Sequence, residues 1–135
     1  MPVETSIMEA LYAHLVDMPG VLPIAWPNRA FTAPGDGKFL RAQFIPNLVE
    51  RTSIRSEDAP RRRGLFQVAV MWPQDQGETL PRNYAGSIAE HFSTDLRLVR
   101  DGVSVRITSY PALADLLIDG SRVMIPVTIP WECLD

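Results

Sequence analysis

Residues 39–72, FLRAQFIPNLVERTSIRSEDAPRRRGLFQVAVMW, decide the fold of this chain. Apolar and polar residues alternate over 38–45 and again over 64–72, and this period of two predicts two half-buried strands. The segment between them, at about 47–63, is polar, charged and too long for a tight turn. Long connections inside compact domains are uncommon and usually serve as binding loops. The sequence therefore predicts two strands joined by a long mobile loop that meets a partner.

Two helices are predicted on either side of these strands. The first spans about 4–17, where apolar residues recur on one face and Ser6 opens a capping box. The second spans about 79–92, with Thr79 as its cap and an apolar residue every four positions. Gly86 costs this second helix roughly 1 kcal/mol relative to alanine, so we expect a neighbouring backbone to approach closely there.

The last third of the chain has the pattern of strands. Asp101-Gly102 and Asp119-Gly120 each separate two apolar alternations, which is a strong hairpin signal. Pro126 and Pro130 stand four residues apart in the final strand. Amide directions alternate along a strand, so both missing donors fall on the same edge. We therefore expect an edge strand, or one whose pairing partner ends before residue 126.

Together these segments predict an α+β fold, a mainly antiparallel sheet of about five strands with two helices packed on it. The 135 residues suit a single domain over 1–135, and 46% hydrophobic residues with a formal charge of −3 argue against disorder. A protein that grips DNA through phosphates usually carries a basic excess, which is only local here. The lone Cys133 and the absence of a signal-peptide or membrane-span pattern predict a soluble, cytosolic protein.

The sequence offers little for catalysis. His14 and His91 fall on separate predicted helices and are most simply helix-flank residues. The carboxylate pairs Glu57-Asp58 and Asp115 with Asp119 fall in predicted loops or turns, where solvated side chains are the ordinary case. There is no nucleophile elbow, phosphate loop or metal-ligand spacing. We therefore predict no enzyme activity, no cofactor and no metal site.

Arginines carry the strongest functional signal. The candidate interface residues are Arg51, Arg55, Arg61, Arg62 and Arg63, interleaved with acidic residues in the predicted loop. Arginine forks suit carboxylates and phosphates alike, so a solvated loop, a protein contact and a nucleic-acid contact all remain open. The mixed charges favour a protein surface.

Four segments, IAWPN at 24–28, FLRAQF at 39–44, GLFQVAV at 64–70 and VMIPVTIPW at 123–131, together resemble a family of phage and prophage proteins similar to the tail terminators of long-tailed phages. The resemblance covers nearly the whole chain, and its motifs are structural rather than catalytic. It implies a homo-hexameric ring that caps the tail tube protein, stops its polymerisation and offers a surface to the head-tail connector protein. It also implies a virion tail component assembled in the bacterial host cytoplasm, with no membrane partner and DNA only as passing cargo.

Three alternatives stay open at this stage. A phage neck or head-completion connector protein would also form rings. A nucleic-acid-binding module would depend on the arginine-rich loop and show steeply salt-dependent binding. A small enzyme would require a deep pocket with perturbed polar groups.

Overall fold

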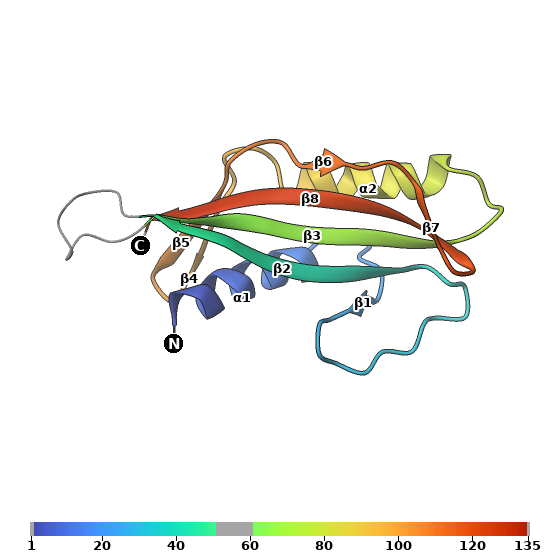
Figure 1. Cartoon of the computed structure of the whole chain (residues 1–135), viewed down its shortest axis with the longest axis horizontal. Helices are drawn as coiled ribbons and strands as arrows, with labels where there is room; N and C mark the ends of the chain where they lie inside the picture. The colour runs from blue at the N-terminus through green and yellow to red at the C-terminus, as the bar shows by residue number, and fades with distance from the viewer. Residues whose placement is uncertain (1, 51–60, 135) are drawn as a thin grey trace.

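The computed structural model describes residues 2–50 and 61–134, and it confirms an α+β fold. The elements are α1 Val3–Val16, β1 Ile24–Ala25, β2 Phe39–Glu50, β3 Arg61–Pro73, α2 Thr79–His91, β4 Arg97–Arg100, β5 Val103–Ile107, β6 Ala112–Leu113, β7 Leu117–Asp119 and β8 Arg122–Leu134. Three long strands, β2, β3 and β8, run side by side, and both helices lie on the same side of them (Figure 1). The sheet has more than the five strands predicted, because several short ones join its margins.

Strand order in the sheet is β1-β2-β3-β8-β5-β4, and β6 and β7 also pair with β8. Every pairing is antiparallel except that of β1 with β2, which is parallel. Both Asp-Gly hairpins are present: β4 turns into β5 at Asp101-Gly102, and β7 turns into β8 after Asp119. Asp101 and Gly102 both have positive φ, 52° and 78°, which is the backbone of a type I′ turn.

The main core lies between the inner face of the long strands and the two helices. Alternate strand residues point inward, as the period of two predicts, and each helix contributes one apolar stripe. Fully buried members include Leu40, Phe66, Val68, Val70, Ile125, Val127 and Ile129 from the strands, and Ile7, Leu11, Leu15 and Ile88 from the helices. This packing fixes which side chains of β2, β3 and β8 face outward.

The prediction that β8 is an edge strand is wrong. β8 pairs with β3 along its whole length on one side and with β7, β6 and β5 in turn on the other. The two prolines do share an edge, because their carbonyl oxygens accept hydrogen bonds from Ala114 and Thr108 on the side of the short strands. The missing donors therefore break up the neighbouring pairing into short pieces, and the β7 pairing ends at Met124, before the first proline.

The segment expected to form a loop is shorter than predicted at both ends. β2 continues to Glu50 and β3 begins at Arg61, with a register shift between Pro46 and Leu48. The polar composition of these flanks concealed their strand structure, which the pairing with β8 supports on one side. Residues 51–60, including the candidate residues Arg51 and Arg55, lie outside the described residues.

The helix ends also differ from the prediction. α1 begins at Val3, so Ser6 lies inside the helix, 1% exposed, and its amide donates to the Pro2 carbonyl. α2 follows Glu78, and no side-chain bond caps it among the described residues. A Cβ at Gly86 would meet nothing within 4 Å, so no backbone of the described chain approaches there.

Candidate interaction surfaces

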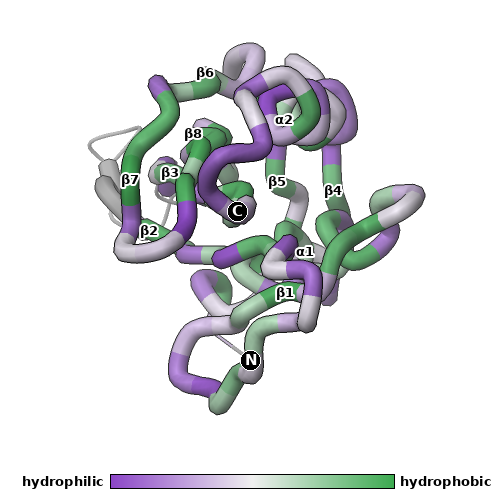
Figure 2. The backbone as a smooth tube through the Cα atoms, turned by 90° about the vertical axis from the view of Figure 1, so that its right-hand side faces the viewer, coloured by the Kyte–Doolittle hydropathy of each residue, from purple (hydrophilic) through white to green (hydrophobic). Residues whose placement is uncertain are grey.

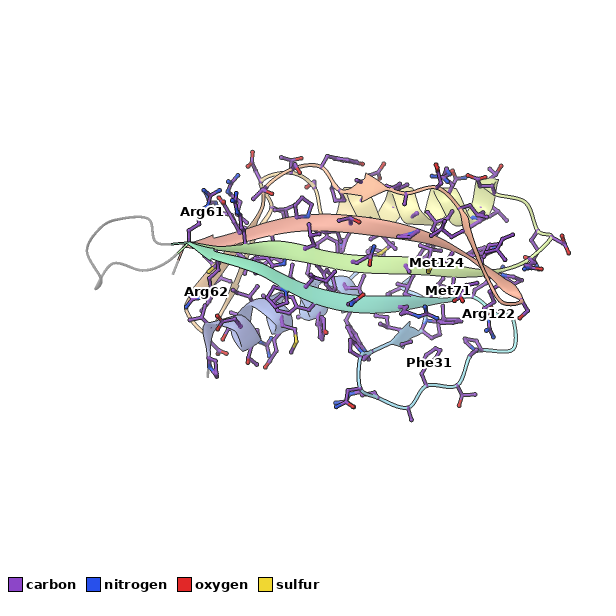
Figure 3. All side chains as sticks on the ribbon, viewed as in Figure 1. Phe31, Arg61, Arg62, Met71, Arg122 and Met124 are labelled. Atoms are coloured by element: carbon purple, nitrogen blue, oxygen red, sulfur yellow. The ribbon has the colours of Figure 1, made fainter. Side chains whose placement is uncertain are left out.

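The predicted arginine cluster lies at one end of the sheet, on the first residues of β3. Figure 3 shows Arg61 and Arg62 at this end, opposite the end that carries Met71 and Met124. We call the part of β2, β3 and β8 around Arg61–Arg63 the arm. Strand pairing at this end joins Arg61 to Glu50 on one side and to Leu134 on the other. Strand β5 also pairs with β8 here, at Trp131, Glu132 and Cys133, so the arm is the end of a wider sheet.

Arg61 is held within the molecule by Glu132 of β8. Arg61 donates from Nε and Nη2 to Glu132 Oε2 at 3.0 and 2.8 Å. Arg106 Nη2 donates to the other Glu132 oxygen at 2.5 Å, and its Nη1 donates to Asp95 at 2.7 Å. The hydrogen bond from Arg106 is the main cause that lowers the pKa of Glu132, burial opposes it, and Arg61 lowers it further. This network ties β3 and β8 of the arm to β5.

Arg62 joins the arm to the first helix. Its Nε donates to Glu4 Oε1 at 3.1 Å, and the pKa of Glu4 is lowered by a backbone hydrogen bond first and by Arg62 second. Arg63 is exposed and lines a groove of about 390 Å³ with Leu65, Thr108 and other residues of the outer face. Arg61 and Arg63, two positions apart on β3, both border this groove.

The outer face of β2, β3 and β8 is mixed in character. At the end far from the arm, Phe39, Ala69 and Met71 are buried, and Ala33 and Met124 pack against them. Phe31 packs on Phe39 with ring centroids 5.0 Å apart, and Arg122 lies over the same ring. Nearer the arm the face is polar, with Arg41, Gln43 and Gln67 around a small hollow. Helices cover only the inner face (Figure 1).

An aromatic groove that sequence reasoning did not find lies beside α1. It has a volume of about 680 Å³ and is lined by Met8, Tyr12, Trp26, Pro27, Asn28 and Arg29. The rings of Tyr12 and Trp26 stand 4.5 Å apart, and burial raises the pKa of Tyr12. Tryptophan, tyrosine, methionine and arginine are the residues enriched at protein interfaces. The two aromatic residues in the sequence gave no hint of a groove, because α1 and the β1 turn meet only in the fold.

The structure also brings His14 and His91 together, which the sequence did not indicate. Their rings stack with centroids 3.9 Å apart, and each Nε2 bonds the backbone carbonyl of the other residue, at 2.7 and 2.5 Å. Carbonyl oxygens only accept, so each ring must carry its proton on Nε2. The Nε2 nitrogens of both rings are therefore committed to joining the two helix ends.

Within residues 2–50 and 61–134, no group of three or more His, Cys, Asp or Glu side chains is placed to hold a metal ion. The helices of the same residues include none that is long and apolar enough to span a membrane. The described residues instead form three candidate interaction surfaces: the arginine-bearing arm, the aromatic groove, and the outer face of the sheet, which no helix covers. Such features suit binding to other proteins.

Comparison with known proteins agrees with this. A family model described as phage tail terminator protein matches residues 6–131. The chain belongs to this family of structural, non-enzymatic proteins, and its role is that of a structural component of a phage tail. A solved structure at 23% sequence identity matches with a TM-score of 0.73, covering 97% of this chain and 92% of that one, and so shares its fold. A search of curated proteins gives no significant match.

Proposed function

We propose that this protein ends the tail tube. In this proposal, identical subunits, six by the family resemblance, close into a ring on the last layer of tail tube protein, stop further addition and offer their other face to the head-tail connector protein. The family match over residues 6–131 carries the proposal. Assembly takes place in the cytoplasm of the bacterial host, and the ring remains in the virion.

The arm is the element best suited to reach the tube. It lies at one end of a long molecule (Figure 1), and three strands and the Glu132 ion pairs hold it in place. A pre-ordered arm loses little conformational entropy on docking, so more of the contact energy appears as affinity. Six arms that meet a six-fold tube end add through multivalency, even where each contact alone is weak.

The same geometry weakens the case for a nucleic-acid-binding module. Arg61 and Arg62 already donate to carboxylates, so a phosphate would have to compete with Glu132 and Glu4. Six copies at −3 each give a ring with a formal charge of −18, which favours free passage of DNA over gripping it. We therefore propose that DNA is cargo for the ring and not its ligand.

Tail length is the test of the proposed function. Phage particles made without this protein should carry tubes longer than normal when viewed by electron microscopy, and the added protein should return them to normal length. Tubes of normal length that fail to join heads would refute the terminator and identify a neck or head-completion connector protein instead.

The contribution of the arm is tested separately with Arg63→Glu. Reversing Arg61 or Arg62 would place a carboxylate against Glu132 or Glu4 and disturb the fold, so these substitutions do not isolate docking. Arg63→Glu should produce overlong tails, and its unfolding temperature, measured against that of the wild type, separates a docking defect from a loss of stability. Arg97→Glu, on the exposed strand β4, is the matched control. Normal tails from Arg63→Glu would exclude the Arg63 side chain from docking.

A further inference from the structure

Strand β7 is an unusual margin of this sheet. In the part of the chain that the structure describes, β7 pairs only with β8, and its other edge has no strand beside it. Its side chains are exposed, Leu117 at 46% and Ile118 at 76%. Figure 2 shows this strand on the outside of the molecule, away from both helices. Two adjacent large apolar residues on an open edge are a template for association.

The other margins of the sheet carry the residues that block such association. β4 is bracketed by Arg97 and Arg100, and β1 is only two residues long and follows Pro23. Charged residues, prolines and short strands are the usual means by which proteins protect exposed edges. The only charged residue of β7 is Asp119, and its Oδ2 forms an ion pair with Nη2 of Arg41 at 3.4 Å. Leu117 and Ile118 thus stay exposed to water, which is unfavourable for apolar side chains unless a partner covers them.

We propose that β7 of one subunit docks into the aromatic groove of the next copy of this chain, the groove defined above by Met8, Tyr12, Trp26, Pro27, Asn28 and Arg29. The inference rests on the proposed ring, because it names the contact by which the ring closes. A closed ring needs a head-to-tail contact between two different patches of the same chain. β7 and the groove are two such patches: Figure 2 shows β7 on a different side of the molecule from β1, and Trp26, next to β1, lines the groove.

The chemistry of the two patches is complementary. The groove offers two aromatic rings and a methionine, against which the more exposed residue, Ile118, can bury its apolar surface. Asp115, two residues before β7, is exposed, and Arg29 borders the groove. Neither has an ion pair with any described side chain. Asp115 of one subunit can therefore pair with Arg29 of the next, which favours a second copy over an unrelated partner.

The first experiment compares Ile118→Arg with Val99→Arg. Val99 is equally exposed, at 73%, but lies on the arginine-flanked strand β4 and is the matched control. Each variant is added to tail tubes purified without this protein, and bound protein is counted. Loss of one central apolar anchor should lower capping by about tenfold or more for Ile118→Arg, while Val99→Arg caps like the wild type. Unfolding temperatures check that both variants fold. Equal capping by Ile118→Arg and the wild type would overturn the proposal.

A charge exchange tests the direction of the contact. Asp115→Arg and Arg29→Asp should each lower capping by about threefold to tenfold, because each places like charges opposite one another. The double variant restores opposite charges at every junction and should return to within about twofold of the wild type. If the double variant loses as much capping free energy as the two single variants together, the two residues do not contact each other.

Disulfide trapping separates this inference from the proposed function. Ile118→Cys combined with Asn28→Cys should give, on oxidation, a ladder of covalent oligomers that ends at a closed ring, and neither single variant should do so. Native Cys133 is 1% exposed and stays out of the reaction. Caps that form on tubes without this ladder would reject the β7 contact and leave the terminator role standing. If the protein does not cap tubes at all, the ladder in concentrated protein alone decides: its presence supports the contact, and its absence rejects it.

Discussion

The stacked pair His14 and His91 should stabilise the fold measurably, and a double-mutant cycle can isolate its contribution. The pair joins the last turns of α1 and α2. Substitution His14→Ala removes one hydrogen bond, worth about 1 kcal/mol net, and one ring stack, worth about 0.5–1.5 kcal/mol. The free energy of unfolding should therefore fall by about 2 kcal/mol, which lowers the unfolding temperature by roughly 6–10 °C for a domain of this size.

His91→Ala should cost about the same, because it loses the reciprocal hydrogen bond and the same stack. The double variant loses two hydrogen bonds but only one stack, so its cost should be about 3 kcal/mol and not 4. The coupling of about 1 kcal/mol is the stack itself. Chemical denaturation of the four proteins gives these values. A coupling below about 0.3 kcal/mol, the limit for independent sites, would refute the reasoning.

The pair also predicts acid sensitivity. Burial is the main cause that lowers the pKa of His14; the charge of His91 lowers it further, while the carbonyl of His91 and the carboxylate of Asp17 oppose it. The unfolded chain then binds the proton more readily than the folded one, so stability contributed by neutral His14 is present above pH 6.5 and is lost as pH falls below it. His14→Ala should flatten the change in stability between pH 7 and pH 5. If the pH dependence of stability is the same in His14→Ala and the wild type, groups other than His14 determine it.

Three further substitutions test other contacts. Tyr84→Phe should cost about 1 kcal/mol, because the Tyr84 hydroxyl accepts from the Leu22 amide at 2.8 Å; the exchange rate of that amide by NMR should rise, and an unchanged rate would contradict the bond. Glu132→Gln should reduce the loss of stability in urea between pH 7 and pH 4, since the carboxylate, with its lowered pKa, contributes stability above about pH 4.5 that fades as pH falls; a pH profile identical to the wild type would count against it. Gly102→Val should cost about 1–2 kcal/mol from the positive φ alone, since a Cβ there meets nothing within 4 Å, whereas Gly35→Val, also in open space but without positive φ, should leave the unfolding temperature nearly unchanged.

Periodicity and turn chemistry predicted most of the fold. The alternations at 38–45 and 64–72 became β2 and β3, and the turns at Asp101-Gly102 and Asp119-Gly120 became hairpins. These signals are local, so one sequence suffices to find them. The wrong predictions concern which strands become neighbours in the sheet. The prolines of β8 showed which edge lacks donors but not that short strands fill it.

The candidate surfaces were predicted less well for the same reason. The sequence drew attention to Arg61 and Arg62, but their partners Glu132 and Glu4 lie far from them in the chain. The histidine stack joins residues 77 positions apart, and helix periodicity cannot register such a pair. The exposed apolar strand β7 was part of a correctly predicted hairpin, but only the fold shows that its outer edge is open.

Strand β8 follows every other described element in the chain, yet it lies in the middle of the sheet between β3 and β5. On the ribosome, β3 therefore lacks its neighbour, and the inner side of the sheet stays incomplete, until these closing residues have emerged. Pairing Arg61–Pro73 with Arg122–Leu134 also closes a large loop, which is a slow step in folding. A chain without Arg122–Leu134 consequently lacks the strand that pairs with β3, β5, β6 and β7, and its core stays incomplete.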